Sequence, residues 1–225
     1  MYKNQNSYYW AFLIMFIPVL GSIVYLVTQV YNKRDAEKIT NEIAHIVNPT
    51  KKVTDLKKQL EFAETYQNRI NLADAFLDIK DYNNAILHYT EALEDTSQNA
   101  FYATKQLIEA YYHLENWDNV ITHVENVKTH TEYKKSRVQF LYGLALEQVG
   151  DIEAAETNLR DIDIRYSFYE ERLILAKFLL HINKNEDAKE ILRNVQTESS
   201  HMTKPNKRLY RTTIFEVDKL LKALN

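Results

Sequence analysis

The chain contains no cysteine and very little glycine or proline. Among its 225 residues there are three glycines and three prolines. The absence of cysteine excludes disulfides, thiolate metal sites and a lipid-modified N-terminal cysteine. Folds rich in strands or loops need more turn residues than this, so the composition predicts an all-helical chain.

Neither sign of charge is in large excess. The sequence has 28 lysines and arginines against 31 acidic residues, and its formal net charge is −3. Such a balance gives no reason to expect nucleic acid as a partner. Hydrophobic residues make up 45% of the sequence, which is enough for a chain of this length to bury a core.

Residues 66–200 carry a pattern that recurs four times. The positions expected to begin the second helix of each copy lie 35, 35 and 33 residues apart: Tyr82, Trp117, Ile152 and Asn185. Apolar residues follow three, seven and ten places later, and these spacings keep side chains on one helical face. Each copy is therefore predicted to be a helical hairpin with one buried side. The three sets are Ala85, Val120, Ala155 and Ala188; Tyr89, Val124, Leu159 and Leu192; and Ala92, Val127, Ile162 and Val195.

The first helix of each copy has a second signature, an apolar residue beside a small one with a large residue three places on. The pairs are Leu72–Ala73, Leu107–Ile108, Tyr142–Gly143 and Leu175–Ala176, and the large residues are Phe76, Tyr111, Leu146 and Leu179. With these features residues 66–200 resemble the tetratricopeptide repeat (TPR) family, which has Leu-Gly, Tyr, Ala, Phe and Ala at these spacings. The chain departs from that family at Val120 and Val127, where the family has alanine, and it lacks the repeat-ending proline.

The periodicity predicts four pairs of helices, with Asp81, Asn116 and Asp151 as caps of second helices. The expected ranges are 66–79 with 82–94, 100–114 with 117–129, 135–148 with 152–164, and 168–181 with 185–198.

The C-terminal segment, residues 201–225, is expected to form one further helix over about 205–224. Its apolar residues form a single stripe, so we expect it to cover the exposed end of the repeats. A dimer seam is the alternative. The stripe consists of Tyr210, Ile214, Val217, Leu221 and Leu224.

An uncharged apolar stretch covers residues 10–31. At about 1.5 Å per residue it is long enough to cross the ~30 Å hydrocarbon core of a bilayer. Trp10 and Tyr31 stand at its ends, where amphipathic rings favour the membrane interface. We therefore predict a single transmembrane helix after a short tail, residues 1–9. A cleaved signal peptide is the alternative interpretation.

Cations follow this stretch closely, beginning with Lys33 and Arg34. The positive-inside rule then places the repeats in the cytoplasm, on a single-pass protein of a bacterial inner membrane.

Inside the stretch, the string containing Pro18, Gly21 and Tyr25 resembles the second membrane helix of the phospholipase-D-nuclease N-terminal module. That module precedes the catalytic part of bacterial cardiolipin synthases, so the resemblance implies an accessory role in phospholipid or envelope synthesis. The module's first helix has no counterpart here. A generic anchor kinked at its proline is the alternative.

Residues 32–65 are expected to form a helical connector that is interrupted at Pro49. Two short apolar seams are present, which permit either a dimerising stalk or an extra helix packed on the first repeat. The seams are Ile39, Ile43 and Ile46, then Val53, Leu56, Leu60 and Ala63.

No motif for catalysis, metal binding or cofactor binding is found. None of the seven histidines has lysine two residues on, as the phospholipase-D signature requires. His-Glu-x-x-His and a glycine-rich phosphate loop are also absent. His123 and His130 share one expected helical face, where exposed histidines are preferred to a metal site. We therefore expect a non-enzymatic protein with no catalytic site, no metal and no cofactor.

The TPR resemblance implies a groove lined by first-helix side chains that binds a protein or peptide. Asp74 and Glu109 stand where the chaperone-binding branch of the family needs asparagine, and carboxylates repel a terminal carboxylate, so that partner class is rejected. An apolar peptide or helix, with a basic residue, is the expected partner. The groove residues are Gln67, Asp74, Asp78, Tyr102, Lys105, Glu109, Tyr112, Arg137, Phe140, Leu144 and Lys177.

A basic patch precedes the end of the chain, at Lys204, Lys207, Arg208 and Arg211. It suits an anionic partner or lipid headgroups, or is simply a solvated outer face. The sequence as a whole predicts a membrane-anchored TPR protein that acts as an adaptor or assembly scaffold. The alternative is the accessory role in phospholipid synthesis.

Overall fold

A computed structural model describes residues 49–224, and the regular structure in this range is entirely helical. The chain divides into two compact units, Met1–Asp55 and Leu56–Asn225. None of the helices between 49 and 224 is both long and apolar enough to cross a bilayer. The predicted tail, the membrane helix with Trp10, Pro18, Gly21, Tyr25 and Tyr31, the cardiolipin-synthase-like string and the first connector seam lie outside the described residues.

The first described helix, α3 (Pro49–Phe62), begins at the proline that was expected to interrupt the connector. Proline is favoured at the start of a helix because no amide hydrogen is needed there. The Lys57 ammonium lies 5.3 Å from the centre of the Phe76 ring. Asn68 donates hydrogen bonds to the carbonyls of Gln59 and Ala63. These contacts favour the extra-helix interpretation of the connector over a dimerising stalk.

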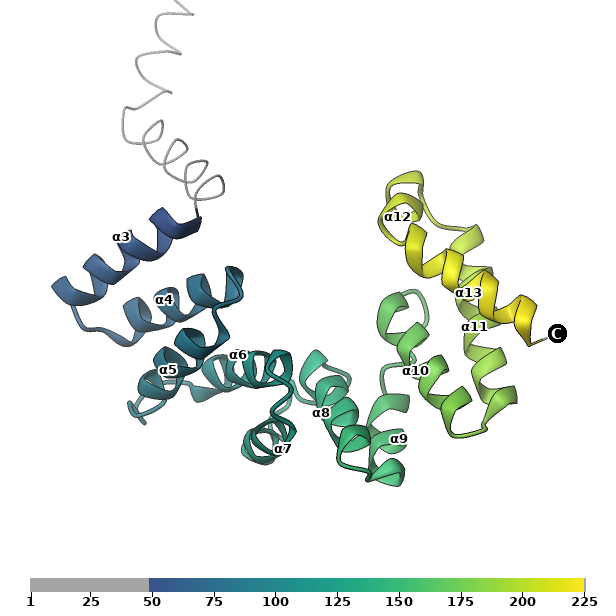
Figure 1. The fold of residues 1–225 in the computed structure, drawn as a ribbon, viewed down its shortest axis with the longest axis horizontal. Coiled ribbons are helices and arrows are strands. Elements are labelled where there is room, and N and C mark those ends of the chain that lie inside the picture. Colours follow the sequence, from purple (N-terminus) through teal and green to yellow (C-terminus); the bar gives the residue numbers. More distant parts are fainter. Residues whose placement is uncertain (1–48, 225) are drawn as a thin grey trace, which may run out of the picture. The chain divides into compact units, whose positions relative to one another are not determined.

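Four antiparallel pairs of helices follow one another in chain order (Figure 1). Their second helices begin at the four predicted residues, which confirms the repeat. The pairs are α4 (Tyr66–Asp78) with α5 (Tyr82–Ala92), α6 (Ala100–His113) with α7 (Trp117–Glu125), α8 (Arg137–Gln148) with α9 (Ile152–Arg160), and α10 (Tyr169–His181) with α11 (Asn185–Ser200).

The turn inside each pair has the same geometry four times. Its central residue is left-handed, and only one of the four is the glycine that this conformation favours. The next residue donates its amide hydrogen back to the first helix, at Phe76, Tyr111, Leu146 or Leu179, which closes a Schellman motif. The left-handed residues are Lys80, Glu115, Gly150 and Asn183.

Capping of the second helices follows the prediction in three pairs. The side chains of Asp81, Asn116 and Asp151 each accept a hydrogen bond from the amide three residues later. In the fourth pair Lys184 precedes the helix and supplies no side-chain cap. The second helices of the middle pairs end at Glu125 and Arg160, four residues before the predicted ends, and turns follow.

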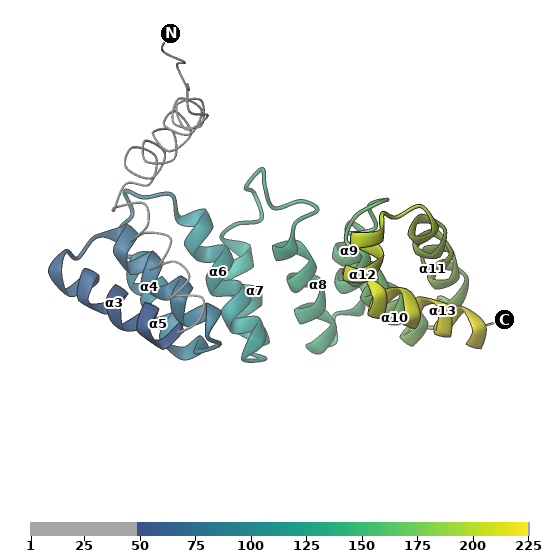
Figure 2. The same ribbon diagram turned by 90° about the horizontal axis from the view of Figure 1, so that it is seen from above.

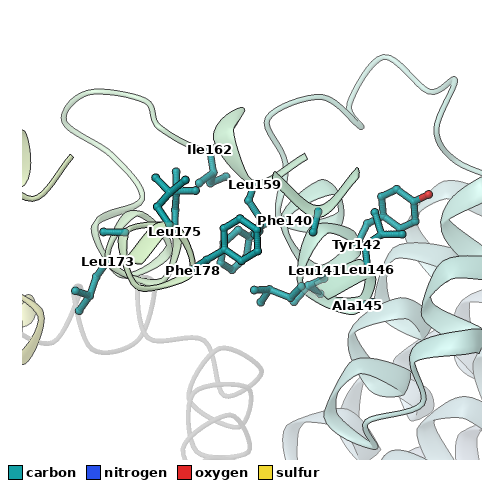
Figure 3. Packing of buried hydrophobic residues seen from close by; sticks show 14 of the residues in the cluster. Phe140, Leu141, Tyr142, Ala145, Leu146, Leu159, Ile162, Leu173, Leu175 and Phe178 are labelled. Atoms are coloured by element: carbon teal, nitrogen blue, oxygen red, sulfur yellow. The ribbon is translucent and has the colours of Figure 1, made fainter. Parts of the chain in front are cut away.

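The core lies between the helices of each pair and between successive pairs. All twelve residues in the three predicted second-helix sets are buried, as the spacing required. Figure 3 shows part of this core, with Phe140 of α8, Leu159 of α9 and Phe178 of α10 in one cluster. Gly143 lets α9 approach closely, because a Cβ there would lie 2.7 Å from Leu159 Cγ.

One charged pair is buried in this core. Arg172 of α10 is 0% exposed and Glu198 of α11 is 1% exposed. Arg172 donates to Glu198 Oε2 at 2.8 Å and to Asp163 Oδ1 at 2.7 Å. The amide of Tyr166 also donates to Glu198, at 2.8 Å. This pair ties the connection between α9 and α10 to the fourth pair of helices.

The C-terminal segment forms two helices where one was predicted. The chain breaks at Tyr210, between α12 (Lys204–Leu209) and α13 (Arg211–Ala223). Helix α13 packs against α10 and α11, as Figure 2 shows, and buries Thr213, Val217 and Leu221.

Candidate protein-binding face

The candidate site is the exposed side of the four first helices, α4, α6, α8 and α10, called here the first-helix face. A pocket of about 340 Å³ lies on this face between α4 and α6. Three predicted groove residues, Gln67, Asp74 and Tyr102, line it. The complete lining is Tyr66, Gln67, Ile70, Asp74, Gln98, Asn99 and Tyr102.

Asp74 is the centre of this pocket's hydrogen bonding. Its Oδ1 accepts from the Tyr89 hydroxyl at 2.5 Å, and its Oδ2 accepts from the Tyr102 hydroxyl at 3.0 Å. Burial, reinforced by the charge of Asp74, raises the pKa of Tyr102 to about 12. Burial and the hydrogen bond to Asp74 raise the pKa of Tyr89 as well. The pocket therefore holds one carboxylate, and two neutral tyrosines fix its orientation. This carboxylate can bind a cation.

Replacing Asp74 by asparagine is expected to lower the pKa of Tyr102 from about 12 toward the ordinary tyrosine value. The pKa of Tyr102 is above the unfolded value, so its contribution to stability is present below about pH 10 and is lost as the pH rises through the folded pKa. Carbon-13 NMR of labelled tyrosine, assigned with Tyr102→Phe, follows this titration. Asp78→Asn is the matched control, because Asp78 acts on Tyr102 by charge alone, and its effect should be smaller. An unchanged Tyr102 titration in Asp74→Asn would contradict the assignment.

Beyond the pocket, contacts between polar and charged side chains connect the first helices α6, α8 and α10. The Arg137 guanidinium of α8 contacts Glu109 of α6 at 2.9 Å and Glu171 of α10 at 3.4 Å. Glu147 of α8 lies 3.7 Å from His181 of α10. Such partly exposed pairs contribute little to stability, typically about 0–1 kcal/mol. They do fix how neighbouring first helices present their side chains.

Two of the predicted groove residues do not belong to the face. Phe140 is 1% exposed and Leu144 is 8% exposed, so neither side chain is available to a partner. Helix α8 is buried over most of its circumference, because α6 and α7 pack on one side and α9 on the other. An apolar residue at a groove position in this copy therefore completes the core.

The other predicted groove residues reach the surface. Asp74, Glu109 and Tyr112 are half-buried. Lys177 lies 3.9 Å from Glu216 of α13. That these residues bind a partner stays a prediction. The exposed members are Gln67, Asp78, Tyr102, Lys105, Arg137 and Lys177.

Sequence reasoning missed three residues of the face. Tyr66 lines the pocket and donates its hydroxyl to the Asn99 carbonyl at 3.2 Å. Asn99 was recognisable as the cap of α6, where its side chain accepts from the Phe101 amide at 3.0 Å. Glu171 was visible only as a surface charge, since its partner Arg137 is 34 residues away.

Carboxylates outnumber cations on the first-helix face. The cations are Lys105, Arg137 and Lys177, of which Arg137 is already held between two carboxylates. The face therefore has an excess of negative charge. Its carboxylates are Asp74, Asp78, Glu109, Glu147, Glu170 and Glu171.

The described part of the chain offers no group of three or more side chains suited to a metal ion. His123 and His130 do not form an exposed helical pair. His123 stacks on Tyr111 with ring centres 5.3 Å apart, and burial lowers its pKa. His130 lies beyond the end of α7 and stacks on Phe101 at 3.8 Å.

Comparison with known proteins supports the repeat assignment. The tetratricopeptide repeat family matches residues 66–94, which span α4 and α5. MamA (41-end) from Desulfovibrio magneticus RS-1 has a similar fold, with a TM-score of 0.64 and 16% identity over 74% of this chain and 95% of that one. TTC0263, a thermophilic TPR protein of Thermus thermophilus, gives a TM-score of 0.55 and 14% identity over 82% and 100% of the two chains. No curated protein sequence matches.

At these identities the likeness concerns the fold, which is an all-α TPR-like solenoid.

Proposed function

We propose that this TPR-like protein is a membrane-anchored, non-enzymatic scaffold whose first-helix face binds a protein partner through the partner's basic side chains. The observation that carries the proposal is the pocket between α4 and α6, in which Asp74 is held as an oriented acceptor. Tyr66 and Tyr102 line the same pocket, and aromatic rings attract cations as well as apolar chains. A lysine or arginine side chain suits both features.

The burial of Phe140 and Leu144 changes the expected partner. With these two side chains inside the core, the face offers little apolar area in the third copy. Polar and charged contacts must then supply the specificity, and complementary charge mainly sets partner choice and association rate. A basic segment is therefore a better partner than a purely apolar one.

Membrane anchoring rests on the apolar stretch of residues 10–31, which is uncharged and of bilayer length. An anchor would hold the first-helix face close to partners in or on the same membrane.

A photo-crosslinking amino acid placed at Tyr102 of the full-length protein, in its native membranes, tests both parts. We expect a discrete crosslinked species at this position, and we expect it to stay in the membrane pellet after an alkaline carbonate wash. The matched control is the same amino acid at Leu87, which is 50% exposed on second helix α5. Mass spectrometry of the crosslinked peptide should identify lysine or arginine beside the contact.

The partner should be lost when Gln67 is changed to alanine and Asp78 to lysine, because both residues are exposed on the face and the second change replaces a carboxylate by a cation. The control variant changes Asn83 to alanine and Thr90 to lysine, which are exposed positions of α5. Equal crosslinking at positions 102 and 87, or the same partner in both variants, would show that the first-helix face is not the binding surface. Release of the protein by carbonate would refute the anchor alone.

A further inference from the structure

The outer side of the two C-terminal helices carries more cations than carboxylates. Every residue of α12 is exposed, and α13 exposes the side opposite to the one packed on α10 and α11. We call this surface the C-terminal basic face. Its exposed cations are Lys204, Lys207, Arg208, Arg211, Lys219 and Lys222.

Both acidic residues of this region have partners, and one of the partners is a cation of the face itself. Glu216 lies 3.9 Å from Lys177 on α10 and 3.6 Å from Lys219. Asp218 accepts a hydrogen bond from Gln196 of α11 at 2.6 Å. Within residues 49–224, Lys204, Arg208 and Arg211 make no ion pair with any carboxylate. The charges of Lys204, Arg208 and Arg211 are therefore not neutralised by the described part of the protein, whereas Lys219 is paired with Glu216.

Two large apolar side chains stand among these cations. Leu209 is 69% exposed at the end of α12, and Phe215 is 66% exposed on α13. On α13 the spacing from Arg211 to Phe215 to Lys219 places all three on one side of the helix. Leu209 also borders a hollow of about 480 Å³ with Lys204, Pro205 and Arg208. A second hollow, of about 260 Å³, is lined by Ser199, Ser200, Lys207, Arg211 and Ile214.

We propose that the C-terminal basic face docks on an anionic lipid surface. Lysine and arginine on a helix, together with exposed leucine or phenylalanine, are what an interfacial helix uses: the cations meet headgroups and the apolar side chains enter the acyl boundary. The cations are spread along two helices and the two apolar side chains stand apart. That arrangement fits an extended charged plane better than one acidic peptide, which would need a continuous groove.

The absence of cysteine gives a direct test in the full-length chain. Thr212 is exposed on α13 beside this face, so Thr212→Cys can be labelled with a polarity-sensitive fluorophore. The labelled protein is reconstituted into vesicles of phosphatidylcholine alone, or of phosphatidylcholine mixed with phosphatidylglycerol. We expect a blue shift and quenching by spin-labelled lipid in the mixed vesicles only, weakened by added salt.

Two comparisons make the result specific. Changing Lys204, Lys207, Arg208 and Arg211 to glutamine should abolish the shift, because each cation strengthens attraction to an anionic surface about fivefold. A control variant changes four other exposed lysines to glutamine, so its net charge is altered equally. It should keep the blue shift of the fluorophore. The four residues are Lys58, Lys80, Lys134 and Lys135. A label at Glu153→Cys on α9 should not respond to lipid.

Several results would overturn the proposal. One is an equal shift in neutral and mixed vesicles, and another is a shift that survives in the four-glutamine variant. A third is a label that responds to an added polyglutamate peptide and not to phosphatidylglycerol, which would assign the face to an acidic protein. Thermal unfolding of each variant separates these results from a loss of folding. The first-helix face is unaltered in all of them, so the outcome is independent of the proposed scaffold function.

Discussion

Replacing Glu198 by alanine is expected to lower the free energy of unfolding by about 3–5 kcal/mol, the usual cost of removing one partner of a buried ion pair. The variant leaves the Arg172 guanidinium at 0% exposure with Asp163 as its remaining charged partner. Arg172 Nη2 already has no hydrogen-bond partner among the described residues. The Tyr166 amide loses its acceptor at the same time. Urea unfolding followed by circular dichroism measures the change.

Arg165→Ala is the matched control, because Arg165 approaches the same carboxylate at 3.5 Å from the surface, with its own side chain 65% exposed. Its loss should cost no more than about 1 kcal/mol. Similar losses in the two variants would mean that the buried pair is not what stabilises this region. A combined Arg172→Met and Glu198→Leu variant should recover most of the stability, since apolar groups of similar size replace both charges.

The same pair should make the fold sensitive to acid. Burial by itself raises the pKa of Glu198, but hydrogen bonds from Arg172 and the Tyr166 amide outweigh it, so the pKa lies below its usual range. A depressed folded pKa means that the stabilisation is complete above the unfolded pKa, about 4.3, and is lost as the pH falls through the folded pKa. The difference between wild type and Glu198→Ala should therefore shrink at low pH.

Replacing Gly143 by valine is expected to lower the free energy of unfolding by about 3 kcal/mol, at the upper end of the usual range for overpacking a core. A Cβ at this position would lie 2.7 Å from Cγ and 2.8 Å from Cδ2 of Leu159, and 3.2 Å from its backbone nitrogen. Valine adds two methyl groups to that clash. The better helix propensity of valine offsets only a fraction of the cost. Thermal unfolding and urea unfolding both measure this loss of stability.

A double-mutant cycle tests the cause. Leu159→Ala alone should cost about 2–5 kcal/mol through the cavity that it leaves. In the Gly143→Val background it should cost much less, because the clashing atoms are removed. Gly150→Asn is the control for glycine loss: nothing lies within 4 Å of its Cβ position, and Asn183 adopts the equivalent left-handed turn in the fourth pair. If the losses of stability caused by Gly143→Val and Leu159→Ala were strictly additive, a clash between the two side chains would be excluded as the cause.

Features set by local interactions were predictable. The starts of the second helices and the caps at Asp81, Asn116 and Asp151 depend on neighbouring residues, so spacing alone located them. The groove was only partly predictable, because exposure at Phe140 depends on which helices pack around α8. Arg172 could not be recognised as buried, since its partner Glu198 is 26 residues away in the sequence. The break at Tyr210 falls at the first residue of the predicted stripe, so the spacing of the apolar residues did not indicate it.

The spacing between successive copies changes at one place in the chain. From the small residue of each first helix to the start of its second helix the interval is constant, as Ala73 to Tyr82 and Ala176 to Asn185 both illustrate. The shortening from 35 to 33 residues therefore falls between the start of α9 and Ala176 of α10. In the connection between these two helices Tyr166 and Phe168 adopt left-handed backbone angles, which bulky residues rarely accept. The fourth pair of helices is therefore offset by two residues from the 35-residue spacing that relates the first three.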